Sequence, residues 1–222
     1  MLRDRVEAGA RLAQMLRSHT SEPGTVVIGL ARGGVVIAAE IARILHLPLD
    51  VCIVRKLGVP WQPELAFGAI ASGGVRILHH DLIRECGLTV EEINTVASAE
   101  ESELQRRQLR YCGSRPSPDY RSWKIILADD GIATGATLEA SIQSLRLRGA
   151  ARIIVAVGVA QRDAIARFRQ LADEVVVALA PEALGAISCW YDSFPQTSDE
   201  EVIALLRNSS APGNDEGQPE QP

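Results

Sequence analysis

The sequence is poor in aromatic residues, in cysteine and in positive charge. Phenylalanine, tryptophan and tyrosine together make up 4% of the 222 residues, and the four cysteines are scattered without a C-x-x-C pair. This cysteine pattern predicts neither a disulfide framework nor a zinc site. The formal net charge of -5 argues against a dedicated nucleic-acid-binding protein, because such proteins usually carry a basic face.

Long apolar runs are also missing. No run is long enough to span a bilayer, so we expect no membrane-spanning segment. The chain also opens without the basic, apolar and small-residue pattern of a secretory signal. From these two absences we expect a cytoplasmic location.

The sequence does contain a regular alternation of apolar strands and amphipathic helices. Five apolar runs predict buried strands, at 25–30, 49–54, 123–128, 152–157 and 174–179. Helical spacing of apolar residues predicts helices over 2–18, 35–46, 136–148, 161–171 and 199–207. The first helix is predicted from Leu2, Val6, Ala10, Ala13 and Leu16. Because buried strands joined by helices form parallel sheets with right-handed crossovers, we expect an α/β fold with a central parallel twisted sheet flanked by helices.

Residues 57–121 interrupt this rhythm. Strand-like runs at 65–70 and 75–78 surround Gly73-Gly74, which predicts a β-hairpin. A long polar helix, rich in Glu and then in Arg, is predicted over 89–110. We therefore expect a hairpin-plus-helix excursion from the main sheet.

The segment that follows strand 123–128 carries the strongest signal for chemistry. Asp129 and Asp130 stand at the carboxyl end of that strand, where ligands bind in open α/β sheets. The residues after them are small or hydroxylated and run into a helix: Gly131, Ala133, Thr134, Gly135, Ala136 and Thr137. Backbone N–H groups and hydroxyls at such a helix start bind phosphate. Carboxylates beside a phosphate site fit a ligand with a diol, because carboxylates accept hydrogen bonds from hydroxyls.

Two basic elements accompany this segment. Arg32 lies in the glycine-containing turn 29–34 after the first strand, and its guanidinium fork matches phosphate oxygens. Arg55 and Lys56 end the second predicted strand, which places them at the same edge of the sheet. A solvated strand end is the plainer interpretation of these two residues.

The apolar strand, the two acids, the short spacer and Thr-Gly-x-Thr resemble the phosphoribosyl pyrophosphate motif of type I phosphoribosyltransferases. The run Ala31, Arg32, Gly33 and Gly34 resembles the pyrophosphate loop of the same family. A longer pattern over 3–207 is similar to a group of predicted bacterial phosphoribosyltransferases. It includes Arg55-Lys-Leu-Gly, Pro63-Glu-Leu-Ala, Arg115-Pro and Trp190-Tyr.

The resemblance implies a Mg²⁺-dependent enzyme that transfers the 5-phosphoribosyl group to a nitrogenous base or amine and releases pyrophosphate. Asp129 and Asp130 would hold the ribose as catalytic residues, and Gly131 with residues 133–137 would bind the ribose 5-phosphate, its 5'-phosphate lying on 133–137. Residues 31–34, Arg55 and Lys56 would bind the pyrophosphate. Magnesium would bridge substrate oxygens and keep several waters, so no direct protein ligand is expected.

The family also builds a small hood over its site from a terminal segment, for which 181–207 is the candidate here. Trp190, Tyr191 and Phe194 cluster in it, and a planar base could stack on these rings. The alternative is that the rings pack the segment onto the domain. Ala133 stands where 6-oxopurine enzymes carry an Asp, which argues against hypoxanthine and guanine as acceptors and leaves the acceptor open.

Other functions and assemblies stay open. A catalytically silent protein that senses phosphoribosyl pyrophosphate or a nucleotide would keep the same pocket, whereas a hydrolase lacks an obvious nucleophile here. The excursion at 57–121 either closes over the site or pairs with another subunit, so a homodimer is one arrangement to consider. We expect a single domain over 1–207 and a disordered tail over 208–222, because the tail has almost no apolar residues.

Overall fold

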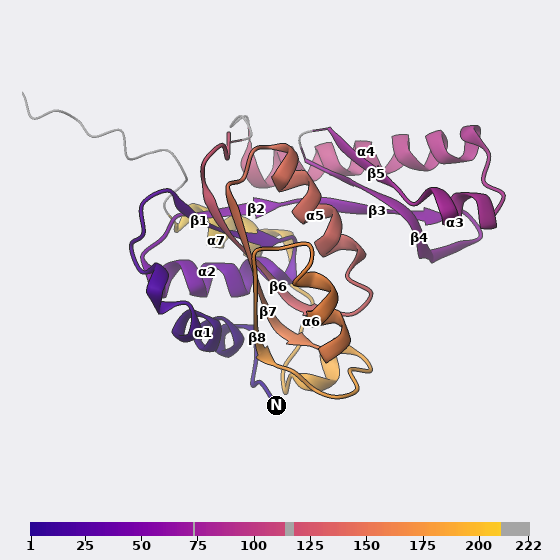
Figure 1. The fold of residues 1–222 in the computed structure, drawn as a ribbon. Coiled ribbons are helices and arrows are strands. Elements are labelled where there is room, and N and C mark those ends of the chain that lie inside the picture. Colours follow the sequence, from indigo (N-terminus) through magenta and orange to yellow (C-terminus); the bar gives the residue numbers. More distant parts are fainter. Residues whose placement is uncertain (73, 114–117, 210–222) are drawn as a thin grey trace, which may run out of the picture.

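The central element of the fold is a five-stranded parallel sheet with the strand order β2-β1-β6-β7-β8 (Figure 1). The computed structural model describes residues 1–72, 74–113 and 118–209. The strands are β1 (Thr25–Leu30), β2 (Leu49–Cys52), β6 (Lys124–Ile132), β7 (Arg152–Ala160) and β8 (Glu174–Leu179). The predicted parallel α/β fold is confirmed, and the strands predicted at 25–30 and 174–179 match residue for residue.

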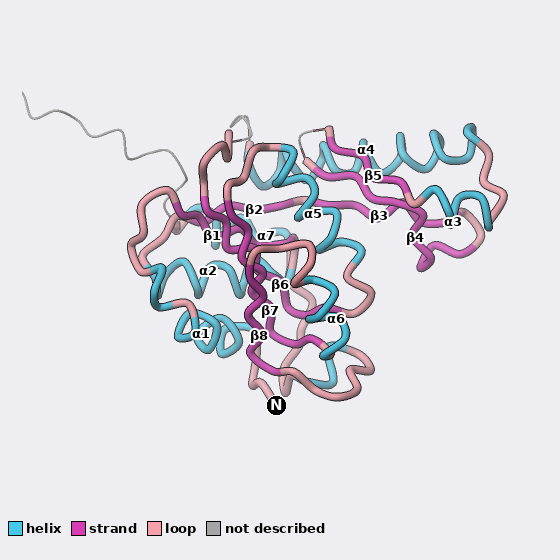
Figure 2. Tube along the Cα trace, in the orientation of Figure 1, coloured by secondary structure: helices cyan, strands magenta, loops and turns pink. Residues whose placement is uncertain are grey.

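Helices cover both faces of this sheet (Figures 1 and 2). On one face lie α1 (Arg5–Met15) and α2 (Gly33–Leu45), and on the other lie α5 (Ala136–Leu147) and α6 (Arg162–Phe168). A short 3-10 turn, η1 (Arg17–His19), follows α1. The strands have apolar side chains on both faces because each face is buried under helices, which is typical of parallel sheets.

Strand β1 illustrates how alternation divides the core. Val26 and Ile28 face the cluster that contains the buried side chains of α5, whereas Val27 faces the cluster formed with α1 and α2. All three are fully buried. Burying a side chain of this kind contributes about 1.5–3 kcal/mol.

The predicted excursion is an arm that extends sideways from the parallel sheet (Figure 1). It contains an antiparallel sheet of β3 (Val54–Val59), β4 (Gln62–Ala71) and β5 (Val75–Leu78), followed by α3 (His80–Glu85) and α4 (Val90–Cys112). The β4–β5 hairpin and the long helix are confirmed. Gly73 lies outside the described residues, as does the Arg115-Pro pair.

One expectation about this arm was wrong, and one helix was missed. The short helix α3 was not predicted. Arg55 and Lys56 do not end the second parallel strand, because β2 stops at Cys52 and both residues lie inside β3. They pair with Ile70 and Ala69 of β4, in the antiparallel sheet.

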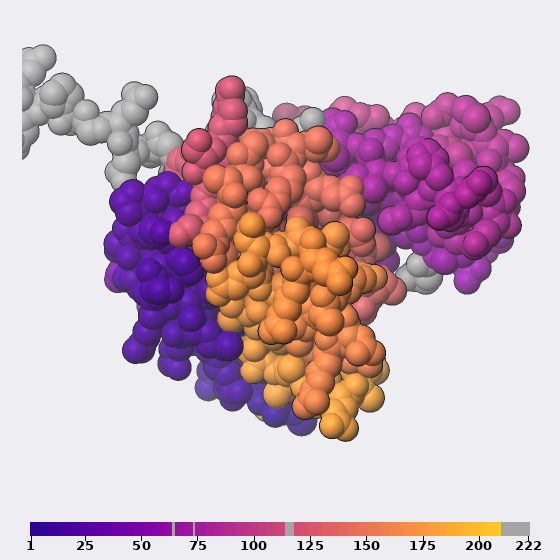
Figure 3. Space-filling model, viewed as in Figure 1, coloured from indigo at the N-terminus to yellow at the C-terminus, as the bar shows by residue number. Residues whose placement is uncertain are grey.

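The N-terminus of the chain pairs with the segment that follows β8. Leu2 forms a parallel β-bridge with Tyr191, and the backbone N–H of Leu2 donates to the carbonyl of Trp190 over 2.9 Å. Trp190 closes the 3-10 turn η2 (Ile187–Trp190), and the chain then leads to the last helix, α7 (Asp199–Arg207). In the space-filling view the N-terminal surface touches the C-terminal segment (Figure 3). Residues 210–222 of the predicted tail lie outside the described residues.

The face predicted for the first helix is buried in part: Leu2, Ala13 and Leu16 are buried, but Val6 is not. Val6 is 47% exposed, and the buried residues are Arg5, Ala8, Gly9, Leu12 and Ala13. An arginine therefore occupies the buried stripe of an otherwise apolar helix. Across the described ranges, no helix combines the length and apolarity that a membrane crossing requires.

Candidate functional site

Asp129 and Asp130 lie near the carboxyl end of β6, in the middle of the parallel sheet. The predicted strand ended at 128, but β6 continues to Ile132 by pairing with β7. Both acids are therefore held by strand geometry and not by a loop. The backbone N–H of Asp130 donates to Oδ1 of Asp129 over 2.8 Å, which fixes the first carboxylate beside the second.

The second carboxylate is bound by an arginine that the sequence did not single out. Arg5 Nε and Nη2 donate to Oδ2 of Asp130 over 3.1 Å and 3.0 Å. The side chains are 9% exposed for Arg5 and 19% exposed for Asp130. This partly buried ion pair joins the start of α1 to the acid pair.

The pKa values of Asp129 and Asp130 are both raised. Burial raises the pKa of Asp129 well above its ordinary value, and the neighbouring charge of Asp130 raises it further. Burial also raises the pKa of Asp130, while the guanidinium of Arg5 opposes that rise. Carboxyl groups with perturbed pKa values are typical of functional sites.

The loop from Ala31 to Gly34 lies directly against these acids. A Cβ atom on Gly33 would stand 2.2 Å from Oδ2 of Asp130, and a Cβ atom on Gly34 would stand 3.0 Å from the Cα of Asp129. Glycine is therefore required for this approach, since any side chain would collide. The peptide bond between Ala31 and Arg32 is cis. The structure thus brings together the loop and the acid pair, as the sequence predicted.

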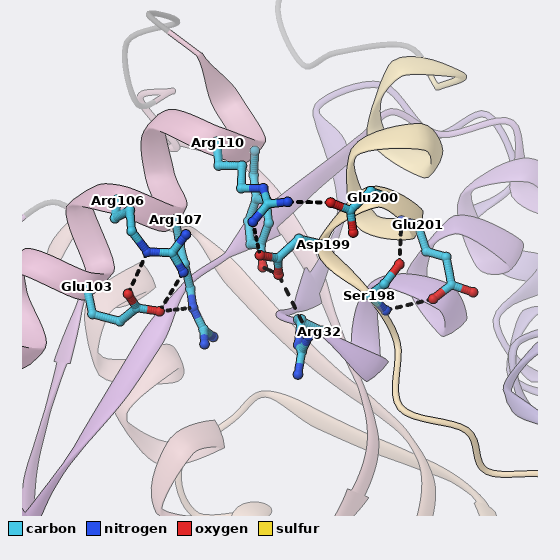
Figure 4. Close-up of polar contacts among 10 residues, drawn as sticks. Arg32, Glu103, Arg106, Arg107, Arg110, Ser198, Asp199, Glu200 and Glu201 are labelled. Carbon is cyan, nitrogen blue, oxygen red and sulfur yellow. Dashed lines mark hydrogen bonds and ion pairs between the residues drawn. The ribbon is translucent and has the colours of Figure 1, made fainter.

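Arg32 extends from this loop toward the first turn of α7 (Figure 4). Its Nη1 lies 3.8 Å from Oδ1 of Asp199, which is an ion pair but too long for a hydrogen bond. Asp199 has stronger partners, because Arg110 Nη1 donates to its Oδ2 over 2.7 Å and the hydroxyl of Tyr111 donates to its Oδ1 over 2.6 Å. The side chain of Arg32 is 27% exposed and is held loosely.

The arginines of α4 are engaged in ion pairs. Both Arg106 and Arg107 bind Glu103 of the same helix, through contacts of 2.7 Å and 2.8 Å. Figure 4 shows these side chains beside Arg110, which also binds Glu200. The carboxylate of Asp199 therefore links this part of α4 to Arg32.

The predicted basic residues Arg55 and Lys56, both in β3, lie in different environments. Arg55 Nε donates to Oε2 of Glu100 on α4 over 2.6 Å, so its charge already has a partner. Lys56 is exposed. Their role in binding pyrophosphate stays a prediction.

The predicted phosphate loop joins β6 to α5. Gly135 is the N-cap of α5 and has a φ of 77°, and the helix begins at Ala136. The first backbone N–H groups of a helix have no intrahelical partner, so they are available to an anion. Arg167 of α6 braces this loop by donating to the carbonyl of Thr134 over 2.6 Å. The sequence offered no signal for that contact.

The aromatic residues of the C-terminal segment pack against the site. The hydroxyl of Tyr191 donates to the backbone carbonyl of Asp130 over 2.7 Å, and Tyr191 is 4% exposed. Trp190 Nε1 donates to the carbonyl of Leu184 over 2.6 Å. Phe194 lies 4.9 Å from the ring of Tyr191 and beneath the guanidinium of Arg5. These contacts correspond to the packing alternative, and stacking of a base stays a prediction.

Comparisons with known proteins agree with this geometry. The protein named "Putative phosphoribosyl transferase Rv0571c" in Mycobacterium tuberculosis strain ATCC 25618 / H37Rv is 46% identical over 203 residues. Those residues cover 91% of this chain and 46% of that protein, and MT0597 of strain CDC 1551 / Oshkosh gives the same values. The chain spans about half the length of the curated relatives it matches.

A solved structure is similar over almost its whole length. The crystal structure of TT1426 from Thermus thermophilus is 38% identical and has a TM-score of 0.80. The match covers 95% of this chain and 99% of that chain. The profile of the phosphoribosyl transferase domain matches residues 2–182. The chain therefore belongs to the phosphoribosyl transferase domain family.

Proposed function

We propose that this protein transfers the 5-phosphoribosyl group from phosphoribosyl pyrophosphate to a nitrogenous base or amine. The observation that supports this most directly is the position of Gly33 and Gly34 against Asp129 and Asp130. A pyrophosphate loop, two carboxylates and a phosphate loop then follow one another along one sheet edge. This order matches the pyrophosphate, the ribose and the 5'-phosphate of one substrate.

Each element has a role that its chemistry supports. Asp129 and Asp130 accept hydrogen bonds from the ribose hydroxyls, and their negative charge stabilises the cationic ribose carbon as the leaving group departs. Residues 133–137 bind the 5'-phosphate through backbone N–H groups. Arg32 binds the leaving pyrophosphate with its guanidinium fork, together with the backbone of the Ala31–Gly34 loop.

Magnesium fits this arrangement as an ion carried by the substrate. Within the described part of the chain, no three His, Cys, Asp or Glu side chains gather into a metal-binding group. Magnesium usually binds one or two carboxylates together with substrate phosphates and keeps several waters. In this proposal the ion would lie near Asp129 and Asp130, held by the substrate's oxygens and by water and not directly by the protein. When bound, it neutralises the charge that develops on the pyrophosphate.

The acceptor, the metabolic role and the cellular location are proposed more narrowly. Nothing at Ala133 exchanges a proton with a 6-oxopurine, so another base or an amine is the proposed acceptor. A role in nucleotide metabolism is part of this proposal, and a cytoplasmic location stays a prediction. A silent sensor of phosphoribosyl pyrophosphate is the second candidate, because the Tyr191 hydroxyl and the Trp190 indole N–H already donate to backbone carbonyls of this chain.

Pyrophosphate release separates the two candidates. We expect the wild type, with Mg²⁺ and phosphoribosyl pyrophosphate, to release pyrophosphate steadily when the correct acceptor is supplied from a panel of purines, pyrimidines and amines. Asp130→Asn should lower that turnover at least about tenfold, because a neutral amide stabilises the cationic ribose less. Asp81→Asn is the matched control, since the Asp81 side chain is 87% exposed.

Two outcomes would contradict enzymatic transfer. Unchanged turnover in Asp130→Asn would remove the acid pair from the reaction. Tight binding of phosphoribosyl pyrophosphate without turnover on any acceptor of the panel would favour the sensor.

A further inference from the structure

Arg5 uses its guanidinium to join three parts of the molecule. Nε and Nη2 donate to Oδ2 of Asp130, and Nη1 donates to the carbonyl of Pro195 over 2.7 Å. The Cζ atom lies 3.8 Å from the centroid of the Phe194 ring. Helix α1, strand β6 and the C-terminal segment therefore meet at one side chain.

This placement is costly for a residue with only a structural task. Removing a guanidinium and a carboxylate from water is unfavourable, and apolar residues of similar volume often stabilise a core as well as an ion pair does. Arg5 lies on the same helix stripe as Ala8 and Leu12, where an apolar residue would fit the pattern. A charged residue at this position therefore indicates a task at the carboxylate.

The charged and titratable groups around Asp130 show what that task is. Asp129 faces it from the same strand, Arg5 faces it from α1, and the Tyr191 ring faces it from the C-terminal segment. Arg5 supplies the positive charge among these groups. Its Nε and Nη2 both donate to Oδ2 and not to Oδ1, the oxygen that this inference assigns to a ribose hydroxyl.

The C-terminal segment also contacts Asp130, both directly and through Arg5. Tyr191 binds the backbone carbonyl of Asp130, while Arg5 binds its carboxylate and is itself held by Pro195 and Phe194. The backbone and the side chain of Asp130 are thus both tied to residues 191–195. The orientation of Asp130 depends on that segment through Arg5.

We propose that Arg5 is a positioning residue, which aims the Asp130 carboxylate at the ribose hydroxyls and couples it to the segment 191–195. This inference rests on the proposed binding of phosphoribosyl pyrophosphate. It assigns no contact between Arg5 and the substrate, because Arg5 acts through Asp130. Its effect should therefore be larger on ligands that contain the ribose than on pyrophosphate alone.

Calorimetry with two ligands tests this assignment. Arg5→Met removes the charge at similar length, and Arg5→Lys keeps the charge but loses the fork that spans Asp130 and Pro195. We expect Arg5→Met to weaken Mg²⁺–phosphoribosyl pyrophosphate binding by about tenfold or more, with Arg5→Lys between it and the wild type. Binding of Mg²⁺–pyrophosphate should weaken clearly less than binding of Mg²⁺–phosphoribosyl pyrophosphate in both variants. Arg5 packs against Gly33 of the 31–34 loop, where a Cβ atom would stand 2.9 Å from its Nε, but its hydrogen bonds go to Asp130 and Pro195.

Hydrogen exchange provides a second readout that needs no ligand. The N–H groups of Asp192 and Ser193 donate to the carbonyls of Leu2 and Arg3. We expect these amides to exchange faster in Arg5→Met, since the segment loses the Pro195 contact. Arg11→Met is the matched control, because Arg11 lies on the same helix, has a side chain 45% exposed and forms its ion pair with Glu7.

The outcomes distinguish this inference from the proposed function. If the wild type binds phosphoribosyl pyrophosphate and both folded Arg5 variants bind it equally well, the role of Arg5 is overturned. The proposed function then stands. Equal losses for phosphoribosyl pyrophosphate and pyrophosphate would also overturn it, because they indicate general disruption. If Arg5→Met does not fold, Arg5→Lys decides by the same criteria. A folded wild type that does not bind phosphoribosyl pyrophosphate would overturn the proposed function and this inference together.

Discussion

The hydroxyl of Tyr191 donates to the backbone carbonyl of Asp130 over 2.7 Å, so the C-terminal segment is anchored on the acid pair itself. Gly158 of β7 makes this contact sterically allowed, because a Cβ atom there would stand 1.9 Å from the Tyr191 oxygen. The contact places the Tyr191 hydroxyl against β6 and β7, next to the acid pair. The stability of the segment and the geometry of the site are therefore linked.

Removing this hydroxyl should destabilise the protein modestly. Tyr191→Phe leaves the Asp130 carbonyl without its donor, which should lower the free energy of unfolding by about 1 kcal/mol. Gly158→Ala should cost more, because the new methyl group displaces the ring. Denaturant unfolding of both variants and of the double variant measures these costs. The double variant should lose less than the sum, since the phenylalanine ring has no oxygen to collide with; strict additivity would contradict the contact.

The acid pair should make the protein less stable as the pH rises. Burial, followed by the charge of Asp130, raises the pKa of Asp129 well above 3.8. A folded-state pKa above the unfolded value means that the folded protein loses stability as the pH rises from about 4 through the folded pKa. We therefore expect Asp129→Asn to be more stable than the wild type at pH 7.5, by on the order of 1 kcal/mol.

Metal-free unfolding measured across pH checks this expectation. The gap between Asp129→Asn and the wild type should close as the pH falls below the ordinary aspartate value of 3.8, where the carboxyl is protonated in both states. The exposed Asp81→Asn control should show no such opening gap. A wild type that stays more stable than Asp129→Asn at every pH would contradict the raised pKa.

The junction between α4 and α7 should depend on one carboxylate and not on its neighbour. Asp199 is 13% exposed and accepts from both Arg110 and Tyr111, whereas Glu200 is 72% exposed and binds Arg110 only at the surface. Asp199→Asn should lower the free energy of unfolding by about 1–3 kcal/mol. Glu200→Gln should change it by less than about 0.5 kcal/mol.

The contribution of Asp199 to stability should depend on pH in the opposite direction to that of Asp129. The hydrogen bond from Tyr111, followed by the charge of Arg110, lowers the pKa of Asp199 below 3.8. Its contribution to stability is therefore present above pH 3.8 and is lost as the pH falls through the lowered pKa. Equal effects of the two substitutions at pH 7 would show that the junction is only a surface ion pair.

The sequence predicted the parts of the fold whose signals are local. The strand at 25–30, the strand at 174–179 and the helix at 199–207 were predicted with the bounds that the structure has. Each of them has an uninterrupted apolar run or a capped start, such as the capping box between Ser198 and Glu201. The approach of the loop 31–34 to the acid pair was also predictable, because carboxyl ends of parallel strands share one edge.

What the sequence did not reveal depends on contacts between distant residues. Arg5 and Asp130 are 125 residues apart, and an arginine near a helix start resembles an ordinary solvated residue. The apolar run 49–54 likewise does not show where the chain leaves one sheet for another. Val54 is buried in β3 just as a residue of β2 would be, so Arg55 and Lys56 were placed at the end of the wrong strand.

Binding of phosphoribosyl pyrophosphate tests the central claim most directly. Calorimetry on the wild type, with and without Mg²⁺, should give binding that requires the metal and is abolished in Asp129→Ala/Asp130→Ala. The double variant must remain folded, which its far-UV circular dichroism and melting curve would establish. No binding by the folded wild type, or equal binding by the folded double variant, would contradict the claim that the acid pair holds the ribose of this substrate.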